Sequence, residues 1–131
     1  MSKRMEAEAL KIETYSKKYD NEIITLILDI QNKEFKINLP LQEQPDLLDI
    51  GYYYQQQGGE FWIVLSERHV VGTLGLMKRE HNCAIMKKFF VKKEFRSRKV
   101  GISLYNGLLH FAKTAGIQHI ILAPLRSASI S

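Results

Sequence analysis

Apolar residues recur at helical spacing in the first part of the chain. Asp20 stands where it can cap a helix, and the residues that would form the buried face behind it are Ile23, Leu26, Ile27 and Ile30. A second helix is predicted from Pro45, which suits a first helical turn, to the Gly58-Gly59 pair. Its apolar face would hold Leu47, Ile50 and Tyr54. A weaker pattern over residues 9–19 predicts one strand ahead of both helices.

The pattern changes to that of strands after Gly59. Phe61 to Leu65 and Val70 to Leu76 are rich in β-branched and bulky apolar residues, and a polar break between them predicts a hairpin. A third strand is expected from Cys83 to Val91, a helix from Val100 to Ala115, and a last strand from Ile117 to Leu122. This order predicts an α/β fold with a mixed, mostly antiparallel sheet flanked by helices.

Length and composition limit the class of protein. The 131 residues fit one domain, residues 1–131, with 45% apolar and 25% charged residues and three prolines. That balance excludes a disordered or collagen-like chain. No apolar run approaches a membrane span of roughly 18 residues, so we expect no membrane partner. The single cysteine, Cys83, cannot form an internal disulfide, which favours an intracellular, cytoplasmic protein.

The positive charge is concentrated in one segment. Residues 87–99 hold seven basic residues and one acid, a net charge of +6, whereas the whole chain carries +5. A polyanion is the natural partner of such a segment. A solvated charged face is the other interpretation, and charge alone leaves both open.

The stretch from Phe89 to Leu109 is the one that predicts chemistry. A strand ends near Val91, a short basic loop follows, and a helix begins near Val100. The first N–H groups of a helix have no partner within it and carry partial positive charge, so a phosphate or pyrophosphate fits there. Gly101 in the first turn would let a ligand approach the backbone closely.

This stretch resembles the acetyl-CoA-binding segment of the GNAT family of N-acetyltransferases. That segment is an apolar strand ending in valine, a connection with an aromatic residue, the motif Arg/Gln-x-x-Gly-x-Gly/Ala, and an amphipathic helix. The residues that match are Val91, Phe95, Arg96, Gly101, Leu104 and Leu108. The upstream sequence GGEFWIVLSERHVVGTLGL is similar to the family's second and third strands. The resemblance extends over about residues 9–122.

The resemblance implies a fold, a reaction and a binding segment. The reaction would move an acetyl group from acetyl-CoA to a primary amine of an unidentified acceptor, with an oxyanion donor on the strand backbone near Phe90. The residues implied in acetyl-CoA binding are Phe89, Phe90, Val91, Arg96, Ser97, Arg98, Lys99, Val100, Gly101, Ile102 and Ser103. No catalytic residue is assigned: Glu34, Glu60, Glu80 and His81 stay open as bases. Tyr52, Tyr53 and Tyr54 would line an acceptor pocket or pack in the core. No metal site is expected, because the histidines lack ligand spacing.

The sequence departs from the family pattern at two places. Lys99 stands where the motif has its first glycine, and a backbone angle that favours glycine would have to admit a side chain there. Only nine residues follow Leu122, where the family has a helix, often with a tyrosine acid, and a hairpin. The fold is therefore expected to be truncated at its C-terminus, with weak or absent turnover. The apolar strand 117–122 would be a sheet edge, which favours a homodimer.

Two other functions stay open. A GNAT-like protein could bind CoA without catalysis, since the part that carries the usual acid has no counterpart. A small nucleic-acid-binding module would explain the basic segment with its interleaved phenylalanines. Phe89 and Phe90 point to opposite faces of a strand, however, so one of them must be buried, and we expect no nucleic acid as a partner.

Overall fold

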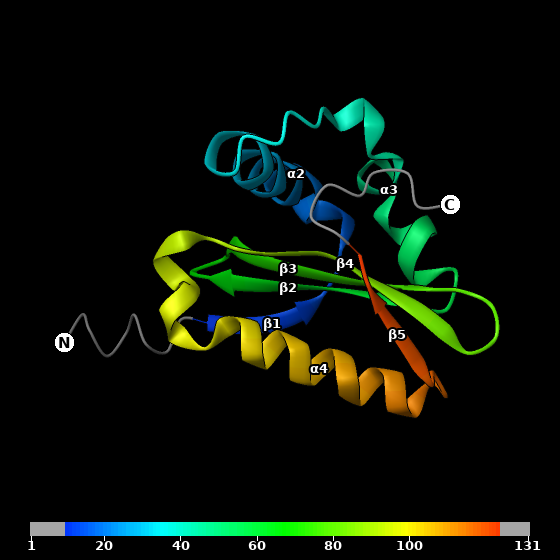
Figure 1. The fold of residues 1–131 in the computed structure, drawn as a ribbon. Helices are drawn as coiled ribbons and strands as arrows, with labels where there is room; N and C mark the ends of the chain where they lie inside the picture. Colours follow the sequence, from blue (N-terminus) through cyan, green and yellow to red (C-terminus); the bar gives the residue numbers. More distant parts are fainter. Residues whose placement is uncertain (1–9, 124–131) are drawn as a thin grey trace.

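A computed structural model describes residues 10–123, which form a five-stranded sheet with helices on both faces (Figure 1). The strands lie in sequence order: β1 (Leu10–Thr14), β2 (Glu60–Ser66), β3 (His69–Lys78), β4 (Cys83–Val91) and β5 (His119–Leu122). The first four pair antiparallel, and β5 runs parallel to β4. The predicted α/β fold with a mixed, mostly antiparallel sheet is confirmed.

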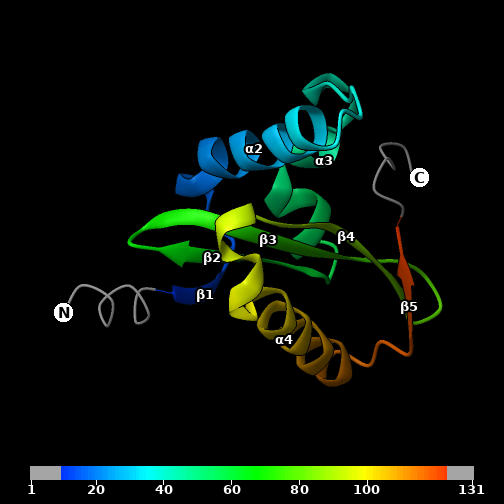
Figure 2. The ribbon, with the colours of Figure 1, turned by 60° about the vertical axis from the view of Figure 1, so that its left-hand side comes forward.

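Helices cover the two faces unequally, as the second view shows (Figure 2). One face carries α2 (Asp20–Leu28), which continues as a π-helical segment (Asp29–Glu34), then α3 (Pro45–Leu48) and a second π-helical segment (Gly51–Gln55). The other face carries, among the described helices, only α4 (Val100–Thr114). Short 3-10 turns lie at Lys17–Tyr19, Leu41–Glu43 and Lys93–Arg98. No helix within residues 10–123 is long and apolar enough to cross a membrane.

Each face of the sheet has its own apolar core. Ile23 and Ile27 of α2 and Tyr54 are fully buried against the inward side chains of β2 and β3. On the opposite face, Leu104 and Leu108 of α4 pack on Val64. Because α4 joins β4 to the parallel strand β5, its first turn lies at the end of β4.

The second predicted helix is interrupted. Asp49 has an extended backbone (φ −156°, ψ 70°) that ends α3 after one turn. Its carboxylate oxygen Oδ1 then accepts a hydrogen bond from the Tyr52 N–H at 3.3 Å and so caps the segment that follows. The break turns Tyr54 onto the sheet, where Gly75 leaves room for its ring: a Cβ at Gly75 would lie 2.6 Å from Tyr54 Cε1.

Candidate functional site

Strands β4 and β5 separate midway along β4. Pairing runs from Cys83 opposite His119 to Met86 opposite Leu122, and the Ala123 N–H donates to the Met86 carbonyl at 3.1 Å. From Lys87 to Val91, β4 has no strand partner on that side among the described residues. Apart from the Val91 carbonyl, which accepts a hydrogen bond from Arg96 Nε, the backbone groups on that side could pair with an extended ligand as with an added strand.

The open half of β4 leads directly to the first turn of α4. The 3-10 turn Lys93–Arg98 connects them, and its cationic side chains are exposed. The first backbone hydrogen bond of α4 runs from the Ser103 N–H to the Lys99 carbonyl at 3.1 Å, so the three N–H groups before Ser103 have no intrahelical acceptor. Free N–H donors, helix polarity and nearby cations together suit a pyrophosphate.

Lys99, at the position of the first glycine of the motif, adopts a backbone conformation that favours glycine. Its φ of 61° and ψ of 22° lie in the left-handed region, immediately before α4. This backbone turn is made by a lysine, whose side chain makes no capping hydrogen bond. The loop therefore keeps its turn and places an exposed ammonium group at the helix N-terminus.

Arg96 ties the loop to the opposite layer. Its guanidinium contacts both carboxylate oxygens of Glu34 at 2.5 and 2.7 Å, and its Nε donates to the Val91 carbonyl at 2.8 Å. The hydrogen bonds from Arg96 hold the pKa of Glu34 below its ordinary value and raise the pKa of Arg96. The side chain of Arg96 thus braces the loop against the end of the π-helical segment.

Gly101 lies under the ring of Phe89. A Cβ at this position would lie 3.3 Å from Phe89 Cζ, closer than ordinary van der Waals contact. Phe89 is 38% exposed on the α4 side of the sheet, while Phe90 is buried on the other side. Packing against Phe89 alone therefore disfavours a side chain at Gly101.

A bulge interrupts β4 where it separates from β5. Gly75 pairs with Lys87 and Thr73 with Phe90, so Lys88 and Phe89 both lie opposite Leu74. Lys88 has a left-handed backbone (φ 57°), and its carbonyl accepts a hydrogen bond from Thr73 Oγ1 at 2.8 Å. Such bulges redirect backbone groups and side chains.

Asp46 and Lys88 form a buried ion pair that sequence reasoning missed. Lys88 Nζ lies 3.2 Å from Asp46 Oδ2, with the two side chains 3% and 4% exposed. The Tyr54 hydroxyl donates to the same oxygen at 2.7 Å. Burial, and then the charge of Asp46, raise the pKa of Tyr54 well above its usual range, so this hydroxyl stays a donor. The one sequence signal was a pair of lysines within an otherwise apolar strand.

Lys87 is buried beside this pair. It is 5% exposed, and burial lowers the pKa of its ammonium, although the nearby Asp46 opposes that shift. Two of the seven basic residues in the cationic segment are thus interior, and the exposed ones gather at the loop before α4.

The structure does not bring the four open base candidates together. Glu34 is held by Arg96, and Glu60 accepts from Gln55 Nε2 at 2.7 Å. Glu80 and His81 lie in the turn before β4, at the strand end opposite the loop, with side chains 93% and 89% exposed. The candidates are therefore scattered rather than brought together.

The three tyrosines divide between surface and core. Tyr54 is fully buried, Tyr53 packs partly against the same core, and Tyr52 is 49% exposed. Tyr52 and Tyr53 stack edge to face with ring centroids 5.2 Å apart. Within residues 10–123, no three His, Cys, Asp or Glu side chains are grouped so that they could hold a metal ion.

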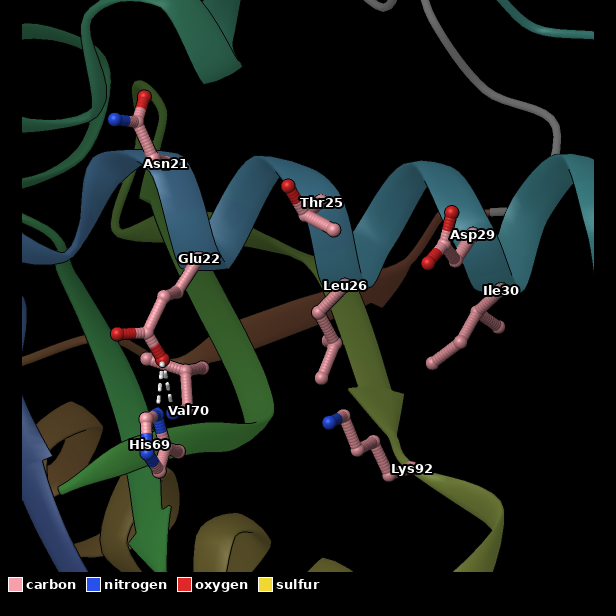
Figure 3. Close-up of a pocket in the computed structure, with 9 residues that line it drawn as sticks. All are labelled: Asn21, Glu22, Thr25, Leu26, Asp29, Ile30, His69, Val70 and Lys92. Atoms are coloured by element: carbon pink, nitrogen blue, oxygen red, sulfur yellow. Dashed lines mark hydrogen bonds and ion pairs between the residues drawn. The ribbon is translucent and has the colours of Figure 1, made fainter.

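A pocket of about 460 Å³ lies under α2, beside the last residues of β4 (Figure 3). Glu22 closes one end, accepting from the Val70 N–H at 2.9 Å, with His69 Nδ1 at 3.6 Å. Leu26 and Ile30 form the apolar wall, and the side chain of Lys92 extends toward them from the start of the loop. This pocket lies on the α2 face of the sheet, opposite the face that carries α4.

Comparison with known proteins accounts for this arrangement. The sequence profile of the Acetyltransferase (GNAT) family matches residues 24–130. A GNAT-family acetyltransferase from Staphylococcus aureus Mu50 is 36% identical, with a TM-score of 0.87, over 88% of this chain and 73% of that one. An acetyltransferase from Streptococcus agalactiae 2603 is 30% identical, with a TM-score of 0.84, and the match again covers 88% of this chain and 73% of that one.

More distant likenesses concern the fold alone. Ard1 from Thermoplasma volcanium is 19% identical, with a TM-score of 0.68, over 87% of this chain and 70% of that one. No curated protein sequence matches the chain. The family profile and the two nearer structures are decisive: the chain belongs to the GNAT family of acetyltransferases.

Proposed function

We propose that this protein transfers an acetyl group from acetyl-CoA to a primary amine of an acceptor. The observation that carries the proposal is the open half of β4 running into the unpaired N–H groups of α4. An extended pantetheine arm would pair with Phe89, Phe90 and Val91. A pyrophosphate would lie on the loop and first turn, formed by Arg96, Ser97, Arg98, Lys99, Val100, Gly101, Ile102 and Ser103.

Within this site we assign Arg96 a bracing role. Its guanidinium is bound to Glu34 and to the Val91 carbonyl, so its backbone is what we expect to face the phosphates. Lys99, exposed at the helix N-terminus, supplies the cation.

The chemistry requires two proton movements. The amine nitrogen forms a bond to the acetyl carbonyl carbon, the carbon–sulfur bond breaks, and the thiolate that leaves takes up a proton. An alkylamine with a pKa of about 10.4 is almost wholly protonated near neutral pH, so it must lose a proton before it attacks. A backbone N–H at the bulge of β4, near Phe90, would stabilise the charge that develops on the carbonyl oxygen.

A second candidate is a GNAT protein that binds CoA without catalysis. It is favoured by the scatter of the base candidates: Glu34 is bound by Arg96, Glu60 accepts from Gln55, and Glu80 and His81 lie at the other end of β4. The acceptor and the cytoplasmic location stay predictions under either function.

Release of free thiol from acetyl-CoA, followed with a panel of primary amines, tests the proposal. We expect release of free thiol that depends on the presence of the amine. Binding of CoA with no release for any amine would favour the non-catalytic candidate. Neither binding nor release would contradict both.

A further inference from the structure

The buried Asp46–Lys88 pair lies where β4 needs an unusual backbone. Lys88 is the left-handed residue of the bulge, at φ 57°, and a lysine has no intrinsic preference for that conformation. Something other than the residue type must therefore stabilise it. Its carbonyl is held by Thr73 and its ammonium by Asp46, so both ends of the residue are fixed.

The partner on the helical layer is itself fixed. Asp46 belongs to α3 and receives the Tyr54 hydroxyl on the same oxygen that contacts Lys88. The Tyr54 ring lies against Gly75, which pairs with Lys87 in the sheet. Because glycine has no side chain, this position leaves space for the ring. The contacts from Gly75 to Tyr54, from Tyr54 to Asp46 and from Asp46 to Lys88 thus connect the helical layer to the bulge.

The pair is closed to substrate. Both side chains are almost fully buried, so a direct contact with an acceptor does not fit. Separating a buried charge from its partner costs free energy, so the pair can hold the Lys88 backbone in a conformation that keeps the two charges in contact. The other Asp46 oxygen, Oδ1, is buried without a hydrogen-bond partner among the described residues, so the carboxylate is compensated at Oδ2, by the Lys88 ammonium and the Tyr54 hydroxyl.

We propose that Lys88 and Asp46 are positioning residues that hold the β4 bulge, and with it the backbone N–H groups that would face the thioester. This inference rests on the proposed acetyl transfer for its catalytic consequence. The structural part, that the ion pair holds the left-handed backbone, stands independently of any ligand.

Two double variants separate positioning from other roles. Both double variants, Asp46→Asn/Lys88→Met and Asp46→Asn/Lys88→Gly, remove both charges. Methionine at position 88 resists a positive φ, whereas glycine adopts it freely. We expect the methionine variant to lose kcat by about 100-fold, as for a misplaced reacting group. We expect the glycine variant to stay within about threefold of the wild type, because its bulge is retained. KM for acetyl-CoA should change little in both.

Equal rates in the two double variants would overturn the proposal. Equal loss would mean that the ammonium itself is needed, and equal retention would mean that the pair only adds stability. Lys11→Met, on the exposed face of β1, is the matched control for losing a lysine.

Hydrogen exchange gives a readout that needs neither CoA nor turnover. In Asp46→Asn, which keeps an acceptor for Tyr54, we expect faster exchange at the Phe89 and Phe90 amides than in Lys11→Met. Exchange at Ile63 in β2 should be unchanged relative to that control. Unchanged exchange at the bulge would overturn the inference even if the protein proves to be an active acetyltransferase. Failure of acetyl transfer with faster bulge exchange would instead contradict only the proposed function.

Discussion

Arg96 and Glu34, 62 residues apart in sequence, meet in a bidentate ion pair that joins the loop before α4 to the end of the α2 layer. The pair fixes the loop from the side opposite the first turn of α4. Two parallel hydrogen bonds give it a defined geometry that a single surface contact would lack. The backbone of the loop is thereby held in place before a ligand arrives.

This pair should make stability depend on pH in the acid range. Arg96 lowers the pKa of Glu34 in the folded chain, whereas an unfolded glutamate has a pKa of about 4.3. Between these two pKa values the folded state binds fewer protons than the unfolded state. The contribution is present above that pH and is lost as pH falls through the lower, folded pKa. Urea unfolding at several pH values should therefore show a steeper loss for the wild type than for Glu34→Gln. Parallel curves would contradict the pairing.

Lys99 should be a strained position. A non-glycine residue in the left-handed region costs about 1 kcal/mol, so Lys99→Gly should raise the free energy of unfolding by about that amount. Lys93→Gly is the matched control, since Lys93 lacks a positive φ and glycine should destabilise there by about 0.5–1 kcal/mol. Denaturant unfolding of both variants measures the difference. A destabilised Lys99→Gly would show that the lysine side chain matters more than its backbone.

Gly75 should tolerate no side chain. A Cβ there would lie 2.6 Å from Tyr54 Cε1 and 2.9 Å from Phe61 Cδ2. Gly75→Ala should lower the free energy of unfolding by about 1–3 kcal/mol through overpacking. Gly107→Ala in α4, with nothing within 4 Å, should instead stabilise the protein by about 0.5–1 kcal/mol. If thermal unfolding places both variants level with the wild type, the Tyr54 ring does not lie against the sheet.

Strand β5 should promote self-association. It pairs only with β4 among the described strands, and Ile121 and Leu122 are 56% and 68% exposed. We expect light scattering at ~100 µM to give twice the chain mass, because an apolar edge pairs readily. Ile121→Lys should shift the equilibrium toward the monomer. A monomeric wild type at that concentration would rule out the dimer.

Much of the fold could be predicted because it follows from periodicity. The bounds of β4, the β2–β3 hairpin and the start of α4 at Val100 all lie where the apolar pattern placed them. The break at Asp49 could not be predicted, because an aspartate within an apolar helical pattern reads as one more helical residue. Its capping role becomes visible only once Tyr52 is placed in space.

The buried ion pair beside the proposed site could not be predicted from the sequence. The sequence places Lys87 and Lys88 in a basic segment, because two adjacent lysines in a regular strand point to opposite faces and nothing in the pattern indicates that both are buried. The bulge places both on the α3 face, where burial and Asp46 surround them. Neither a bulge nor an ion pair across 42 residues leaves a periodic signal in the sequence.

Calorimetric titration with CoA tests the central claim most directly. Gly101→Asp places a negative charge and a side chain at the first turn of α4, against the expected phosphates and the Phe89 ring. Gly107→Asp puts the same residue in the same helix, where a Cβ has nothing within 4 Å. We expect CoA to bind the wild type and Gly107→Asp alike, and to bind Gly101→Asp at least about tenfold more weakly. Equal affinity in all three proteins would contradict acetyl-CoA binding at the junction of β4 and α4.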